Sequence, residues 1–145
     1  MEFNIEDYIN SLPLSITKIN VSKKRLTYLP DLSRFKQLTQ LFCFYNQLTS
    51  LPPLNNTLTH LYCDHNQLIE LPPLNNNLTV LYCHHNQLTW LPPLNNKLVH
   101  IFCYNNNIFN NHIKFSYGNK NIIKTLRNFR YTYYLLKFKK HFKRW

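Results

Sequence analysis

The 145-residue chain contains no alanine, a single glycine (Gly118), and six acidic residues against 17 lysines and arginines. The shortage of glycine argues against a phosphate-binding loop, which needs backbone torsions and close approaches that only glycine adopts cheaply. Glu6 and Asp7 form the only adjacent acidic pair, and they lack the surroundings of a general acid and base. We therefore expect no enzymatic activity, no catalytic residues and no cofactor.

The chain also lacks a long apolar run and a secretion signal. The segment from Met1 to Ser11 carries three acidic residues, whereas a secretory signal begins with basic residues and then becomes apolar. No apolar run reaches the ~18 residues that suggest a membrane span. These absences predict no transmembrane segment and a reducing compartment, which is the cytoplasm (host cytoplasm if the protein is viral) with the nucleus as the alternative.

Four cysteines are present, 20 residues apart, at positions 43, 63, 83 and 103. This spacing differs from the paired CxxC spacing of zinc sites. Free cysteine is among the most buried residue types, so we interpret the four as a column in the protein core. Neighbouring parallel strands would also bring them within disulfide range, about 4.4–6.8 Å between Cα atoms, which leaves disulfides as the alternative.

What the chain has in abundance is leucine and asparagine in a repeat of 20 residues, with the consensus LxxLxCxxNxLxxLPPLNNx. The second leucine column reads Leu41, Leu61, Leu81 and Ile101, and the first asparagine column reads Asn46, Asn66, Asn86 and Asn106. A looser copy precedes them between Ile16 and Leu32, with Lys24 in place of the asparagine. Self-similarity at a fixed period predicts a stacked repeat architecture.

Each part of the repeat predicts a local structure. The LxxLxC part alternates as a strand with one buried face, so Leu61 and Cys63 should point inward while His60, Tyr62 and Asp64 point outward. The asparagine amide should satisfy backbone groups in the following turn. The LPPL part cannot be a helix interior or a central strand and should be extended or polyproline-like. The expected strands are Lys18–Asn20, Gln40–Phe42, His60–Tyr62, Val80–Tyr82 and His100–Phe102.

Over about residues 12–108 this pattern resembles leucine-rich-repeat proteins, especially the short LPPL class of bacterial effectors. The asparagine- and lysine-rich, alanine-free composition also resembles leucine-rich-repeat proteins of giant DNA viruses. The resemblance implies a solenoid with one curved parallel sheet of about five strands, an extended convex side, and protein–protein recognition through the concave sheet. Some bacterial effectors add a ubiquitin-ligase domain, but the 37 residues after Ile108 contain no cysteine, so that activity is not carried over.

Outward positions of the predicted strands carry aromatic and polar side chains in successive repeats. Exposed aromatic residues on such a face suit recognition of a protein partner. The alternative is that they stack on one another and only stabilise the sheet. The predicted contact residues are Phe42, Phe44, His60, Tyr62, Asp64, Tyr82, His84, Phe102 and Tyr104.

Histidines cluster beside this predicted face. His65 and His85 occupy equivalent positions one repeat apart, next to Asp64 and His84. Four such side chains could ligate a metal ion. Tandem repetition by itself explains the pairs, so the sequence favours polar surface, and we predict no metal site.

Charge divides the chain. Residues 1–108 hold seven basic and six acidic residues, a net charge of +1, whereas residues 109–145 hold ten basic residues and no acid. We expect an N-terminal cap over residues 1–15, with Asn4 capping a short helix, repeats over 16–108, and a basic aromatic segment over 109–145.

The basic aromatic segment supports three interpretations. Apolar spacing over residues 121–136 predicts a helix that caps the solenoid. Basic residues among aromatic ones can also bind nucleic acid or an anionic membrane surface, or form a solvated face only. The predicted polyanion-binding residues are Lys137, Lys139, Lys140, Lys143 and Arg144.

Overall fold

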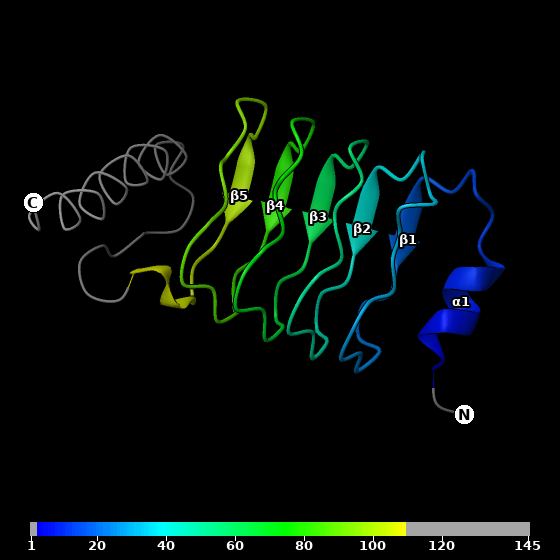
Figure 1. Ribbon diagram of the computed structural model, residues 1–145. Helices are drawn as coiled ribbons and strands as arrows, with labels where there is room; N and C mark the ends of the chain where they lie inside the picture. Colours follow the sequence, from blue (N-terminus) through cyan, green and yellow to red (C-terminus); the bar gives the residue numbers. More distant parts are fainter. Residues whose placement is uncertain (1–2, 110–145) are drawn as a thin grey trace, which may run out of the picture. The chain divides into compact units, whose positions relative to one another are not determined.

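The computed structural model describes residues 3–109, and Figure 1 shows their arrangement. Five parallel strands form one sheet in the order β1-β2-β3-β4-β5. Their bounds are Lys18–Asn20 (β1), Gln40–Phe42 (β2), His60–Tyr62 (β3), Val80–Tyr82 (β4) and His100–Phe102 (β5). These are the strands that the repeat predicts, and the predicted solenoid with a single parallel sheet is confirmed.

The register explains why the repeat length is 20 residues. Leu41 pairs with Leu61, Leu61 with Leu81, and Leu81 with Ile101, so each turn of the solenoid places identical columns side by side. β1 pairs with β2 through Ile19 and Leu41, an interval of 22 residues. The two additional residues fall between Leu32 and Leu38, where the Phe35 side chain is fully buried.

The inward columns form the core of the solenoid. The strand leucines and the leucines at positions 48, 68 and 88 are at most 1% exposed. A leucine side chain gains about 1.5–3 kcal/mol when it leaves water, and stacking provides the cover that a single turn could not supply. The four cysteines lie in this core and form no disulfide with one another, and their predicted burial is confirmed.

The asparagines that follow the strands hold successive turns together. The Asn66 side-chain Nδ2 atom donates to the backbone carbonyls of Cys43, Cys63 and Asp64 at 3.0, 3.1 and 3.2 Å. Its side-chain Oδ1 atom accepts from the backbone N–H of Leu48 at 3.0 Å. Asn46, Asn86 and Asn106 make the same kind of contacts. The prediction that this amide satisfies turn backbone is confirmed, and the side chain also joins neighbouring repeats.

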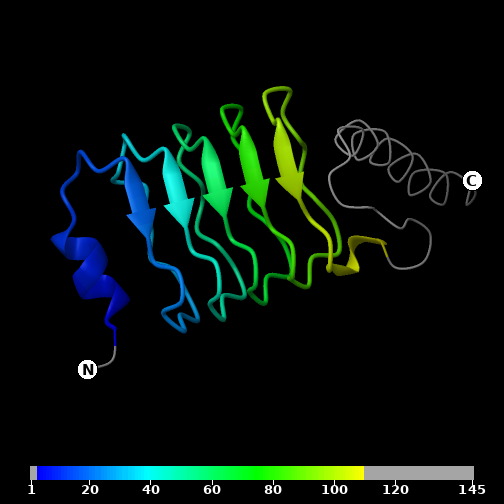
Figure 2. The same ribbon diagram turned by 180° about the vertical axis from the view of Figure 1, so that it is seen from behind.

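The LPPL segments contain neither helix nor strand, as their prolines predict. They lie on the return path between strands, which Figure 2 shows from behind. A second column of asparagines, which we did not predict, forms hydrogen bonds between these return segments and the preceding repeat. Asn75 donates to the carbonyls of Asn55 and Leu58 at 2.7 and 3.0 Å, and Asn55 donates likewise to the preceding turn.

Helix α1 spans Ile5–Ser11 and precedes the sheet. The side-chain Oδ1 atom of Asn4 accepts from the backbone N–H groups of Glu6 and Asp7, so the prediction that Asn4 caps this helix is confirmed. Ile5 and Ile9 are buried. A short 3-10 helix, η1, covers Asn107–Phe109. Among the described residues no helix is long and apolar enough to cross a membrane. The predicted helix over residues 121–136 lies outside the described part of the chain.

Burial predicts that the cysteine thiols are chemically silent. Burial raises the pKa of Cys103 to about 12 and holds the pKa values of Cys63 and Cys83 well above the ordinary range. Because the thiolate is the reactive form, we expect no thiol to react with an aromatic disulfide reagent in the native protein. All four should react in denaturant. A fast native reaction, or fewer than four thiols in non-reducing denaturant, would contradict this arrangement.

Candidate functional site

The outer face of the sheet carries four aromatic rings, one from each of strands β2 to β5, which we call the aromatic row: Phe42, Tyr62, Tyr82 and Phe102. Ring centroids are 4.6 Å apart between Phe42 and Tyr62, 4.9 Å between Tyr62 and Tyr82, and 4.5 Å between Tyr82 and Phe102. The spacing follows from the ~4.8 Å separation of neighbouring strands. The rings are half-buried, so each keeps part of its surface open to solvent.

Both interpretations of these aromatics find geometric support. Phe42 and Tyr62 stack with planes 7° apart, as expected of rings that stabilise a sheet. The Lys18 ammonium adds a cation–π contact, 4.7 Å from the centre of the Phe42 ring. The exposed parts of the rings form a continuous apolar strip along β2 to β5, which is the geometry that recognition needs.

The remaining predicted contact residues differ in position and exposure. The His60 ring lies 6.4 Å from Tyr62, and Phe44 contacts the ring of Tyr45 edge-on. Tyr104 stacks on His84 with centroids 4.5 Å apart. Phe44, His60 and Tyr104 are half-buried.

Asp64 and His84 depart from the expected exposure. The sequence places both on the outer face, yet Asp64 is 7% exposed and His84 is 9% exposed. Rings surround His84 at centroid distances of 4.5 to 6.3 Å, from His65, Tyr82, His85, Phe102 and Tyr104. The pattern of alternating residues could not reveal this cover, because it comes from bulky side chains of neighbouring repeats.

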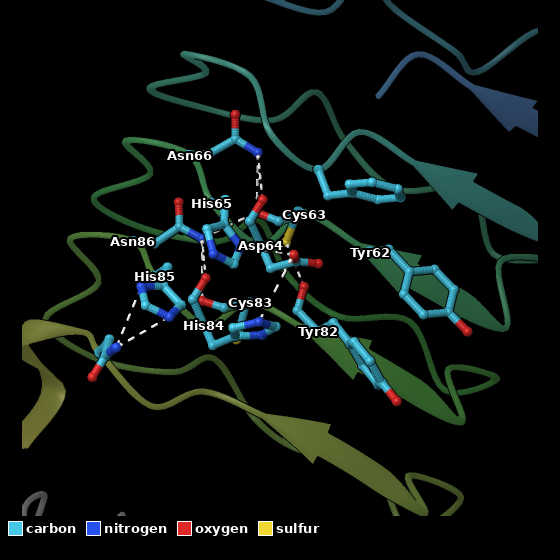
Figure 3. Close-up of polar contacts among 12 residues, drawn as sticks. Tyr62, Cys63, Asp64, His65, Asn66, Tyr82, Cys83, His84, His85 and Asn86 are labelled. Atoms are coloured by element: carbon cyan, nitrogen blue, oxygen red, sulfur yellow. Dashed lines mark hydrogen bonds and ion pairs between the residues drawn. The ribbon is translucent and has the colours of Figure 1, made fainter. Parts of the chain in front are cut away.

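Asp64, His65 and His84 form a compact group that we call the Asp–His cluster. His65 Nδ1 lies 3.0 Å from Asp64 Oδ2, and His84 Nε2 lies 3.8 Å from the same oxygen. Figure 3 shows both imidazole rings approaching the Asp64 carboxylate. The Nδ1 atom of His84 is buried and has no hydrogen-bond partner among residues 3–109.

The environment favours a neutral His84 ring. Burial lowers the pKa of His84, the Asp64 carboxylate opposes this shift, and the neighbouring imidazoles of His65 and His85 lower the pKa further. The net direction is downward from the ordinary value of 6.5. A neutral imidazole keeps a lone pair, so it can serve as a hydrogen-bond acceptor or as a metal ligand.

A second row of side chains lies in the turns after β2 to β5. The sequence identifies His65 and His85 as equivalent positions, but the extension of the row to Tyr45 and Asn105 was not predicted. Tyr45, His65 and His85 stack with centroid distances of 4.0 and 4.2 Å, and Asn105 donates to His85. All four have φ between 50° and 53°, the left-handed region that favours glycine. Asparagine and histidine are among the non-glycine residues enriched in this conformation, so only Tyr45 departs from the usual residue preference.

The five predicted polyanion-binding residues in the tail, Lys137, Lys139, Lys140, Lys143 and Arg144, lie outside the described residues. Their proposed role in nucleic-acid or membrane-surface binding stays a prediction from the sequence.

The solved structures that are similar to this chain include two bacterial proteins. The structure of a Shigella effector leucine-rich-repeat domain shares 37% sequence identity, with a TM-score of 0.60, over 70% of this chain and 44% of that chain. YopM from Yersinia enterocolitica shares 33% identity, with a TM-score of 0.63, over 66% of this chain and 21% of that chain. No protein-family model and no curated protein matches the sequence.

The chain spans less than half the length of either solved protein. Within that span the period, the strand positions and the LPPL return segments all agree with the expected repeat class. The resemblance to viral repeat proteins stays a prediction, because both solved neighbours are bacterial. The chain folds as a leucine-rich-repeat solenoid of about 20-residue repeats, and its structural neighbours are leucine-rich-repeat domains of bacterial effectors.

Proposed function

We propose that this protein is a non-enzymatic interaction module that binds a protein partner through the concave side of the solenoid, which is the outer face of the sheet that carries the aromatic row. The observation that carries the proposal is the aromatic row, in which four half-buried rings from consecutive strands form one apolar strip. The bacterial effector neighbours support a protein-binding role in general. The position of the binding face is our own inference from the rings.

The chemistry of the face indicates what kind of surface it would accept. Tyrosine and phenylalanine provide large contact areas at low conformational-entropy cost, and tyrosine is enriched among residues that dominate binding energy. The tyrosine hydroxyls of the row add hydrogen-bonding groups beside apolar carbon. The face therefore suits a protein segment that presents apolar or planar side chains, and five short strands make it a small interface.

The test removes the two central rings together. Tyr62→Ala combined with Tyr82→Ala should weaken capture of the principal host partner by about 100-fold or more, since residues of this kind each contribute about 2 kcal/mol at binding hot spots. The partner is first identified by affinity purification of the full chain and mass spectrometry. Its affinity is then measured with purified components for the wild type and the variant.

A matched control separates binding from loss of fold. Ile69→Ala combined with Trp90→Ala removes two exposed apolar side chains that lie outside the strands, and it should leave the affinity unchanged. Equal affinity of the double tyrosine variant and the wild type would remove the concave-face proposal. A steep loss of that binding with added salt would favour the basic tail instead, because contacts to phosphates release counterions.

A further inference from the structure

We propose that Asp64, His65 and His84 form a binding site for a divalent transition-metal ion of the zinc type. The three side chains come from two consecutive repeats, immediately after strands β3 and β4. One ligand atom from each residue can be chosen so that all three lie within 4.8 Å of one another. The sequence favoured repetition as the reason for these histidines, whereas the folded chain brings them to one point (Figure 3).

The distances are close to those of a metal site. Ligand atoms in a tetrahedral zinc site with bonds of about 2.0–2.1 Å lie ~3.3 Å apart. The Asp64 Oδ2 atom is already 3.0 Å from His65 Nδ1 and 3.8 Å from His84 Nε2. The second distance is too long for a hydrogen bond but is spanned by one ion bonded to both atoms. The ligand atoms of His65 and His84 lie within 4.8 Å of each other, so we infer that the two rings turn toward the carboxylate when the ion binds.

Burial and charge point the same way. Asp64 and His84 are buried, and within residues 3–109 the ion pairs of Asp64 involve only His65 and His84. A buried carboxylate is costly without a positive partner, and a divalent cation supplies that charge. A buried carboxylate that faces two imidazole rings is an arrangement suited to a bound cation rather than an ordinary surface pair.

The donor set selects the class of ion. Two imidazole nitrogens and one carboxylate oxygen suit Zn²⁺, Co²⁺, Ni²⁺ or Cu²⁺, whereas Ca²⁺ and Mg²⁺ prefer oxygen ligands throughout. Cys63 and Cys83 occupy the core column, so thiolate ligands are not part of this set. Three protein ligands leave a fourth tetrahedral position for water. The inference goes beyond the proposed partner binding and requires no property of the partner.

The test titrates the full, metal-stripped chain with Co²⁺ followed by visible absorption, and then displaces the cobalt with Zn²⁺. We expect one ion per chain with the visible absorption of a tetrahedral site and without a sulfur-to-cobalt charge-transfer band. His84→Gln and His65→Gln should each weaken binding by more than about 100-fold, because even outer-sphere partners of metal ligands contribute 10- to 100-fold. The control His100→Gln alters an exposed histidine outside the cluster and should bind Co²⁺ as the wild type does.

Folding of the variants is checked separately. His65 is only half-buried, so His65→Gln provides a folded variant even where replacement of the buried His84 disturbs the structure. Zn²⁺ should raise the thermal midpoint of the wild type and of the control, and not that of His65→Gln. Wild-type affinity in folded His65→Gln, or a cobalt spectrum dominated by sulfur ligands, would overturn the proposal.

Discussion

Asn66→Ala is expected to lower the free energy of unfolding by about 3–5 kcal/mol. The side chain donates to three carbonyls, including those of Cys43 and Cys63, and accepts from the Leu48 amide. Alanine leaves the Leu48 amide without a partner among residues 3–109, which costs about 1–3 kcal/mol, and it removes one donor from each of the three carbonyls, at about 0.5–1.5 kcal/mol per hydrogen bond. The carbonyls of Cys43 and Cys63 keep Asn46 and Asn86 as donors. Because the contacts join two turns of the solenoid, the loss also weakens the interface between repeats.

Asn76→Ala is the matched control for this substitution, since Asn76 is exposed on the return segment of the same repeat. It should change stability by no more than about 0.5 kcal/mol. Urea denaturation followed by circular dichroism and by Trp90 fluorescence measures both variants. Equal midpoints for Asn66→Ala and Asn76→Ala would mean that the asparagine column that contains Asn66 does not stabilise the fold.

Leu81→Ala is expected to destabilise the protein by about 2–5 kcal/mol, the usual range for a large apolar side chain removed from a core. Leu81 is fully buried in β4 and lies between Leu61 and Ile101 in the stacked column. Because β4 is paired with β3 on one side and β5 on the other, the backbone can move little to fill the cavity left by the leucine side chain. The penalty should therefore include the cavity as well as the lost transfer energy.

Leu14→Ala provides the comparison, because Leu14 is 63% exposed and should be nearly neutral on truncation. Thermal and urea denaturation of both variants give the difference. A loss below about 1 kcal/mol for Leu81→Ala would show that the leucine column is loosely packed and that the ladders of hydrogen bonds dominate stability.

The strands could be predicted from the sequence because they depend on local alternation and on a strict period. Leu61 in β3 and Cys63 directly after it are buried as the alternation requires, and the 20-residue interval places each strand directly beside the next. The role of the Asn66 amide also followed from chemistry alone, since a buried turn needs a side chain that both donates and accepts.

The sequence could not predict which polar side chains of the sheet face become buried. Asp64 and His84 occupy the same repeat position as Phe44 and Tyr104, yet Asp64 and His84 are buried while the two aromatic residues stay half-exposed. The difference depends on the ring orientations in the adjacent repeats, which an alignment of the repeat sequences does not specify.

By itself, then, the sequence determined the period, the inward columns and the parallel stacking of this solenoid, because these features repeat and each repeat reports on the others. Only the tertiary structure decided the meeting of Asp64, His65 and His84. His65 enters the left-handed region with φ of 52°, and its ring is thereby directed to a residue beside it and to one a full turn away. Among residues 3–109 this arrangement occurs once. The sequence placed these side chains in neighbouring repeats, but the orientation of the rings could not be predicted from their spacing.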